Sequence, residues 1–378
     1  MTSKAMARKE TNFKQTDIGL IPHDWEVEEI IDIASISTGG QNTQDAKDGG
    51  LYPFYVRSPK VERINSYLYD TEGVVTAGDG VGVGKVFHYV NGKFGLHQRC
   101  YLIHRFKGVW AKYFYMYFSL QFYNRVMSMT AKSSVDSVRR DMIAHMLIPL
   151  PPIEEQKRIA EVLSHFDEHI DNLVALLEKR KQVKAATMHA LLSGATRLPG
   201  FTAPWINKYL REITSVIRGE ILVSSDFKDG PIPVIGGGTT IAGFHNKANR
   251  EGKTITISAS GANAGYVSFY TMPIFASDCC TLSEGKVYDI EYLYQYLRSV
   301  QNEIYRMQTG GAQPHIYPKD IESLWISMPA SVTEQSAIAS VLSNMDRGIE
   351  ALEEQVEKYR QMKEGAMEEL LTGKVRLV

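Results

Sequence analysis

The string GDGVGVGK at residues 78–85 is the first stretch whose composition suggests chemistry, because glycine-rich loops that end in lysine can cradle phosphate groups. In such loops the lysine is followed by serine or threonine at the start of a helix. Here Val86 follows Lys85 and begins a strand-like run, and Asp79 stands five residues before Gly84, where a glycine is required. The alternating glycines also fail the dinucleotide-binding spacing. We therefore interpret the string as a β-turn or a site of close backbone packing.

Histidine and cysteine form no zinc-binding pattern in the sequence. His97 and Cys100 lie in one half of the chain, and Cys279 and Cys280 lie in the other. These residues are too few and wrongly spaced for the four ligands of a tetrahedral zinc site. The residue that corresponds to His97 in the second half is Ser277, which favours ordinary buried cysteines over metal ligands. The sequence predicts no metal site.

Asp167 and Asp171 would share one face of a helix, a spacing that two catalytic carboxylates could use. The corresponding residues Asp346 and Glu350 lie in a similar helical segment, so a solvated helix face explains both pairs better. The sequence also lacks the GxSxG and HExxH motifs and the Asn/Asp-Pro-Pro-aromatic tetrad that amino-methyltransferases use around a flipped base. We expect no catalytic residues on this chain, which leaves binding as its function.

Composition narrows what the chain can bind. Its 378 residues are 44% hydrophobic, which is enough for two or more cores. The formal net charge is −1, so nucleic-acid binding would depend on local basic patches. Three cysteines indicate a reducing compartment rather than a disulfide framework. Because the chain has no apolar run of membrane-spanning length and no signal-peptide core, we expect a cytoplasmic protein without membrane partners.

The element that must position any binding residues is a duplicated segment. Residues 153–198 return without a gap as residues 332–377, a shift of 332 − 153 = 179, with about 20 identities in 46 positions. An ungapped match with common ends indicates internal duplication. Both copies carry apolar residues at the alternating three- and four-residue spacing of a coiled-coil seam. These are Leu163, Phe166, Ile170, Leu173 and Leu177 in the first copy, and Leu342, Met345, Ile349, Leu352 and Val356 in the second.

We expect each copy to form one long helix that acts as a spacer. The prolines at 151–152 fit a first helical turn, and Gly194 and Gly373 fit C-terminal stops. About 40 residues at 1.5 Å each give a length of roughly 60 Å. Lys184 and Lys363 occupy equivalent seam positions, where a charged group weakens the pairing of two helices but can fix its register.

Each long helix follows a globular segment, and the two segments share a pattern. Trp25 and Trp205 open them, and each then shows strands around a turn, an aromatic helix (113–123 and 292–305) and an extended run into proline. We expect the tyrosine-rich helices to form core rather than base-stacking platforms. A shared scaffold with different loops is typical of two binding sites of different specificity. The predicted order is a domain at residues 1–150, a long helix at 151–198, a domain at 199–328 and a long helix at 329–378.

Loops of the two segments carry side chains suited to DNA. Lysine and arginine neutralise phosphates, whereas glutamine, asparagine, histidine and serine can reach base edges. Two of the groups lie in equivalent loops before the closing helix of each domain, with Asp141 aligned on Asp320. Any single basic pair is more typical of solvated surface, but the occurrence of two groups in matched loops gives DNA contact equal weight, and both interpretations stay open. The candidates are Arg57 and Lys60; Lys132, Ser134, Arg139 and Arg140; Asn246, Lys247 and Arg250; and Gln313, His315 and Lys319.

Short motifs recur at matching places in the two halves of the chain. They are the proline–tryptophan openings (21–25 and 198–205), the EQ, IA and VLS junctions (148–167 and 327–346) and the LL-x-G-x-x-RL ends (191–198 and 370–377), and the second domain adds the GAQPHI loop (311–316). In the first domain the segment SSVD at 133–136 departs from the pattern of the second. With these motifs the chain resembles a known family, the specificity (S) subunits of Type I restriction-modification enzymes. The resemblance covers nearly the whole chain, and the junction found twice is its most specific part.

The resemblance implies an α+β fold class: two similar α/β target recognition domains joined by two long antiparallel coiled-coil helices, with a pseudo-twofold internal repeat. Each domain would read half of an asymmetric bipartite site in double-stranded DNA. The helices would space the domains and dock two methyltransferase (M) subunits, which hold S-adenosylmethionine, so this chain itself would bind no cofactor. Restriction (R) subunits would be a further partner. The alternative is a non-DNA coiled-coil scaffold for two protein partners, which would lack the steep salt dependence of DNA binding.

Overall fold

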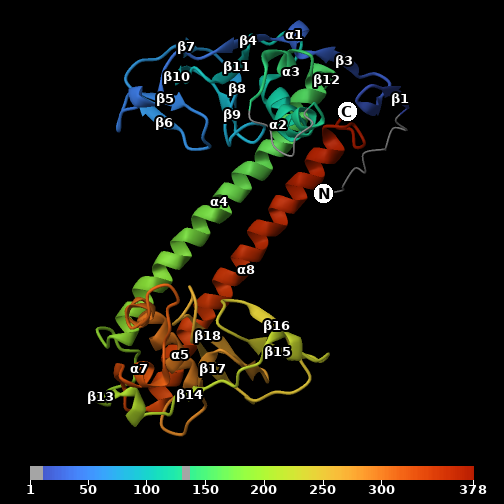
Figure 1. The fold of residues 1–378 in the computed structure, drawn as a ribbon. Coiled ribbons are helices and arrows are strands. Elements are labelled where there is room, and N and C mark those ends of the chain that lie inside the picture. The colour runs from blue at the N-terminus through green and yellow to red at the C-terminus, as the bar shows by residue number, and fades with distance from the viewer. Residues whose placement is uncertain (1–11, 130–136) are drawn as a thin grey trace, which may run out of the picture. The chain divides into compact units, whose positions relative to one another are not determined.

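The computed structural model describes residues 12–129 and 137–378 (Figure 1). The chain divides into two compact units, one formed by Met1–Leu173 with Gln355–Val378 and the other by Val174–Glu354. Each unit contains one globular segment, the start of the long helix that follows it, and the end of the other long helix. The two units are therefore composed of the same kinds of segment, as the duplication predicted from the sequence requires.

The globular part of the first unit is built on two four-stranded sheets (Figure 1). One is antiparallel in the order β4-β11-β8-β9, and the other has the order β6-β5-β10-β7 with β5 and β10 parallel. The pairs β1–β2 and β3–β12 complete it. The strands are β1 (Phe13–Thr16), β2 (Gly19–Pro22), β3 (Glu26–Glu29), β4 (Ser35–Thr38), β5 (Tyr52–Tyr55), β6 (Glu62–Ile64), β7 (Tyr69–Asp70), β8 (Gly73–Ala77), β9 (Phe87–Val90), β10 (Lys93–Leu96), β11 (Cys100–His104) and β12 (Leu147–Leu150).

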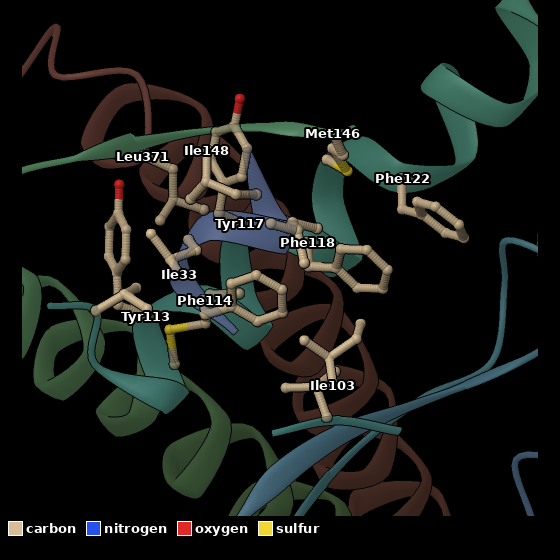
Figure 2. Packing of buried hydrophobic residues seen from close by; sticks show 14 of the residues in the cluster. Ile33, Ile103, Tyr113, Phe114, Tyr117, Phe118, Phe122, Met146, Ile148 and Leu371 are labelled. Carbon is tan, nitrogen blue, oxygen red and sulfur yellow. The ribbon is translucent and has the colours of Figure 1, made fainter. Parts of the chain in front are cut away.

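The aromatic helix α2 (Ala111–Ser128) supplies much of the core of this unit. Phe114, Phe118 and Phe122 recur every four residues, so they lie on one helix face, where all three are buried (Figure 2). Tyr113 is also fully buried, as expected for a core residue, and Leu371 joins the same cluster. Two short helices, α1 (Ile30–Ile33) and α3 (Arg140–Ala144), and the 3₁₀ turn at Thr43–Asp45 complete the domain.

The second unit repeats this plan. Its main sheet has the order β14-β20-β17-β18, a smaller sheet has the order β16-β15-β19 with β15 and β19 parallel, and β13 pairs with β21. The aromatic helix expected at 292–305 is in fact two helices, α5 (Ile290–Ser299) and α6 (Gln301–Arg306), because the backbone leaves the helical conformation at Val300. The other elements are β13 (Trp205–Tyr209), β14 (Ile217–Arg218), β15 (Ile232–Ile235), β16 (Ile241–His245), β17 (Thr254–Ser258), β18 (Val267–Tyr270), β19 (Phe275–Ala276), β20 (Cys279–Ser283), β21 (Trp325–Pro329), α7 (Pro318–Glu322) and the 3₁₀ turns Leu210–Glu212 and Ser224–Asp226.

The long helices are α4 (Ile153–Leu192) and α8 (Val332–Leu370), as the duplicated segment predicts. Gly194 and Gly373 follow them with a left-handed φ of 72°, which is typical of a C-terminal stop. In the first unit Lys363 Nζ donates to Asp167 at 2.5 Å, and in the second Lys184 donates to the equivalent Asp346. The start of one helix thus lies beside the end of the other in each unit, so the helices run antiparallel. Each seam lysine is neutralised by an aspartate of the other helix.

Candidate nucleic-acid interface

The first predicted group lies in the loop after β5, where Arg57 and Lys60 are both exposed. Lys60 pairs with Glu62 of the adjacent strand at 3.1 Å. Arg57 Nη1 donates to Asp79 Oδ1 at 2.6 Å, which places Arg57 against the loop that follows β8. The two cations therefore have different partners. Arg57 contacts a loop from elsewhere in the domain, whereas the Lys60 ammonium pairs with the strand that follows it, β6.

Asp79 joins this cluster to a second arginine. Arg99 Nη1 donates to Asp79 Oδ2 at 2.7 Å. Partial burial alone would raise the pKa of Asp79, but the hydrogen bonds and charges of Arg57 and Arg99 outweigh it and hold this pKa below its ordinary value. The carboxylate is therefore ionised at neutral pH and orients both guanidinium groups.

Strand pairing explains why these three loops meet. β5 and β10 are parallel with Tyr55 opposite Leu96, so the loops that follow them, which carry Arg57 and Arg99, leave at the same edge. β11 begins directly after Arg99 and pairs its first residue with Ala77, the last residue of β8. Asp79 and Arg99 are not among the predicted site residues, because no local sequence pattern marks residues that only strand pairing brings together.

The glycine string is a turn, as interpreted from the sequence. Gly80 and Gly84 have left-handed φ values of 76° and 66°. A Cβ atom on Gly82 would lie 2.6 Å from the carbonyl oxygen of Arg57, so this glycine permits a close backbone approach. Val81 at the tip is 96% exposed. The turn therefore presents a small apolar side chain beside the two arginines.

The second predicted group is only partly described. Lys132 and Ser134 lie outside the described residues. Arg139 and Arg140 are exposed at the start of α3. Just before them, Ser137 forms a β-bridge with Asp79. The start of α3 is thus tied to the loop that holds the arginine cluster.

The fourth predicted group occupies the matching place in the second unit. His315 forms a β-bridge with Ser260, in the loop after β17, and Gln313 is exposed two residues earlier. Lys319 is exposed on α7, with its ammonium 5.8 Å from the centre of the Tyr317 ring. His315 therefore joins this group to the loop after β17, whereas Gln313 and Lys319 lie close to His315 in the sequence and are exposed.

Backbone pairing also corrects the predicted alignment of these loops. Ser137 and His315 make the same bridge in their own units, so they correspond at a shift of 315 − 137 = 178. With this shift Asp141 corresponds to Lys319, and the predicted match with Asp320 is wrong by one residue. Sequence comparison could not place this one-residue difference, because the identity of Asp141 with Asp320 fits a shift of 320 − 141 = 179 and hides it.

The second unit builds a different polar cluster at its loop. Asp278 accepts a hydrogen bond from Ser260 Oγ and lies 3.8 Å from Arg218 Nη2. The Arg218 guanidinium lies 5.9 Å from the centre of the Tyr317 ring, and that ring stacks on His315 with their centres 6.3 Å apart. Ser260, Asp278 and Arg218 were not among the predicted site residues.

The third predicted group is dispersed. Asn246 and Lys247 are exposed after β16. Arg250 is half-buried, and its guanidinium donates to Thr281 Oγ1 at 2.9 Å and to the carbonyl oxygens of Asn249 and Arg218 at 2.7 and 3.1 Å. Most of the donors of Arg250 therefore hold its own domain together, whereas Asn246 and Lys247 face solvent.

The described part of the chain offers no metal centre and no activated thiol. No group of histidine, cysteine or carboxylate residues in the described ranges is arranged to hold a metal ion. Burial raises the pKa of Cys100 and Cys279 to about 12 and that of Cys280 to about 11, so these thiols stay protonated at neutral pH. Among the described residues, none of the helices combines the length and the apolar character needed to cross a bilayer.

Comparison with known proteins follows the same division of the chain. The family described as Type I restriction modification DNA specificity domain matches residues 22–183 and again residues 203–358. The chain is similar to the putative type I restriction enzyme MjaX specificity subunit of Methanocaldococcus jannaschii, with 28% identity over 98% of both chains. It is also similar to the MjaVIII specificity subunit of that organism, with 24% identity over 98% of this chain and 97% of the relative.

The fold has a solved counterpart as well. The crystal structure of the Type I restriction-modification S subunit from M. genitalium superposes with a TM-score of 0.72 and 19% identity, over 98% of this chain and 99% of that chain. These matches do not favour a coiled-coil scaffold unrelated to DNA. The chain belongs to the Type I restriction-modification DNA specificity family, as a non-catalytic DNA-recognition subunit that carries the family's domain twice.

Proposed function

We propose that each domain reads one half of an asymmetric, bipartite site in double-stranded DNA. The first recognition domain spans residues 1–150 and the second spans 199–328, with the helical segments 151–198 and 329–378 setting the gap between the two half-sites. Two similar domains on antiparallel helices suit a pseudo-twofold arrangement of half-sites, as in other symmetric DNA-binding proteins. Unlike loops on the two domains would make the site non-palindromic.

One observation carries this proposal: matching loops of the two units hold unlike polar side chains on the same backbone. Asp79 in the first unit corresponds to Ser260 in the second, since each bridges the segment before the last short helix. Arg57 and Arg99 both pair with Asp79, whereas Ser260 donates to Asp278, which in turn lies beside Arg218. Side chains that differ on a common scaffold would read different base pairs. All twelve predicted loop residues remain candidates for DNA contacts on this proposal.

The helices would also dock partners. Their solvent-facing residues are largely charged, which suits protein–protein contacts at the rim of an assembly. We place two methyltransferase subunits there, with S-adenosylmethionine bound by those subunits, and restriction subunits as further members of a cytoplasmic complex. A structural neighbour with 17% identity and a TM-score of 0.57 is described in connection with complex assembly and conformational transition of the type I R-M system. That assembly motivates this placement.

Mapping methylated adenines in a host with and without this chain and its methyltransferase partner tests the proposal. The expected result is one asymmetric motif of two short half-sites with a fixed gap, methylated only when the chain is present. In vitro, the binding constant of the complex should fall steeply with salt concentration and depend on base sequence. A single continuous motif, or methylation that does not require the chain, would contradict the proposal.

A further inference from the structure

The first unit holds two arginines on a single carboxylate. Arg57 Nη1 and Arg99 Nη1 donate to different oxygens of Asp79, at 2.6 and 2.7 Å. Each guanidinium carries five N–H donors, of which one is used here. In the described part of the chain, neither guanidinium has another hydrogen-bond partner. The cluster therefore presents two oriented, largely unused sets of donors.

The backbone beneath this cluster is fixed by main-chain hydrogen bonds. His97 N donates to Tyr55 O at 3.0 Å, which joins the two loops that carry the arginines. Gly78 N donates to Arg99 O at 2.8 Å, and a Cβ atom at position 78 would lie only 2.8 Å from that oxygen. Side chains that are ordered before binding lose less conformational entropy when a ligand arrives. The arginines are therefore prepared for a ligand before it binds.

Stability does not explain this arrangement. The side chains of Arg57 and Arg99 are 38% and 59% exposed, while that of Asp79 is 22% exposed. Ion pairs with such exposure contribute little to folding. Two arginines held at the surface of a DNA-recognition domain are better explained by what their free donors can bind.

Guanine fits these donors. In the major groove it offers two acceptors, O6 and N7, which match the fork of an arginine, and this is the commonest base-specific contact in protein–DNA complexes. A backbone phosphate would also accept from arginine, but Asp79 offsets one of the two positive charges and so weakens the attraction for phosphate relative to two unpaired arginines. An uncharged base edge is recognised by the geometry of its acceptors, so this loss of charge matters less to it, and the fixed orientation of the two guanidinium groups favours a base over the backbone.

The second unit replaces all three residues. Backbone hydrogen bonds that repeat between the units place Gly237 at the position of Arg57, Ser260 at that of Asp79 and Asp278 at that of Arg99. The corresponding positions of the second unit thus hold a glycine, a hydroxyl and a carboxylate in place of two cations and a carboxylate. The difference lies at one structural position, as expected if that position reads different bases in the two domains.

We propose that Arg57 and Arg99, oriented by Asp79, read guanine through its O6 and N7 atoms in the half-site bound by the first domain. This inference rests on the proposed function and specifies one base that the first domain selects. It follows that the first half-site contains at least one G·C pair. Asp79 acts as a positioning residue, because it contacts the two arginines and not the base.

The test uses the complex of the full chain with its methyltransferase partner and duplexes that contain the mapped site. Each guanine of the first half-site is replaced in turn by 7-deazaguanine, which lacks the N7 acceptor and pairs normally. Wild-type binding should weaken about tenfold or more at one or two positions. Arg99→Ala should weaken binding to the normal site about ten- to a hundredfold and abolish the response to 7-deazaguanine at its position. Asp79→Asn should weaken the same discrimination less.

The matched control is Arg105→Ala, since Arg105 is an exposed arginine at the opposite end of β11. It should leave affinity and base preference unchanged. Retained discrimination at the second half-site shows that each variant is folded. A first half-site without a G·C pair, or unchanged discrimination in both Arg57→Ala and Arg99→Ala, would overturn the guanine assignment alone. So would equal weakening on all sequences with a smaller salt slope, which indicates a phosphate contact. A wild-type complex without sequence-specific binding would overturn the proposed function as well.

Discussion

The guanidinium of Arg197 donates two hydrogen bonds to the carboxylate of Glu334, at 2.6 and 2.7 Å, and Glu334 is fully buried. The first unit repeats this contact, because Arg376 donates to Glu155 at 2.7 and 2.8 Å. In each pair the arginine lies just beyond the end of one long helix and the glutamate lies in the first turn of the other. Each pair therefore ties the two helix segments of its unit together.

Removing one partner of this buried pair should destabilise its unit. Arg197→Ala leaves the Glu334 carboxylate buried without its cation, a change that typically costs about 3–5 kcal/mol of unfolding free energy. Chemical denaturation of the full chain, with hydrogen exchange at the first turn of α8, measures the loss. Lys181→Ala is the control, because Lys181 and Glu353 form an exposed pair that should contribute little to stability. Equal effects of the two substitutions would contradict this role of Arg197.

The ion pairs of the two seams, Lys363–Asp167 and Lys184–Asp346, should tolerate an exchange of their two charges. Asp167→Lys places two cations together with Lys363 and should lower the unfolding free energy by about 1–2 kcal/mol, between the values for exposed and buried pairs. The double variant Asp167→Lys with Lys363→Asp restores an attractive pair and should recover most of the loss. A double-mutant cycle by chemical denaturation measures the coupling. Additive losses in the double variant would show that the two side chains do not interact.

Acid should weaken the first unit. Burial lowers the pKa of His88, His97 and His104, with the charges of nearby arginines adding to the effect at the last two. A histidine whose folded pKa lies below its unfolded value of about 6.5 binds protons more tightly when unfolded. Its contribution to stability is therefore complete above about pH 6.5 and is lost as the pH falls below that value.

Hydrogen exchange of β8 and β11, corrected for intrinsic rates, measures this effect at pH 7.5 and 5.5. Protection should fall at the lower pH, and it should fall less in His104→Asn, whose side chain does not titrate in this range. Equal or greater protection at pH 5.5 would show that these buried histidines do not destabilise the first unit in acid.

Shortening both helices together should change the gap in the DNA site. Deleting residues 171–177 and 350–356 removes one heptad from each helix and keeps both seams in register. Seven residues correspond to about 10 Å of helix, and hence to about three base pairs of DNA. Mapped methylation sites should show a shorter gap and two unchanged half-sites. Sites that keep the original gap would show that the helices do not set it.

The sequence predicted those features that depend on regular spacing. The duplicated seam predicts both long helices, and its spacing identifies Lys184 and Lys363 as seam residues, although it does not identify their aspartate partners. Gly194 and Gly373 were also predicted as helix ends. Such features are readable because a helix repeats its contacts at fixed intervals along the chain.

Features that depend on strand pairing were not predicted. Arg57, Asp79 and Arg99 lie in three loops that become neighbours only because β5 and β10 pair in parallel and β11 pairs with β8. The buried roles of Glu155 and Glu334 were likewise hidden, since a glutamate in a first helical turn usually faces solvent. The one-residue shifts between matching loops of the two units are likewise visible only in the backbone hydrogen bonds, because these define which residues correspond.

The central claim is that two unlike recognition domains each read their own half of one DNA site. The most direct measurement replaces residues 199–328 with the corresponding domain of a relative that has a different specificity, and then maps methylated adenines in a host that supplies the methyltransferase partner. We predict that one half-site changes to that of the relative, while the other half-site and the gap stay the same. A change in both half-sites, or in neither, would contradict the claim.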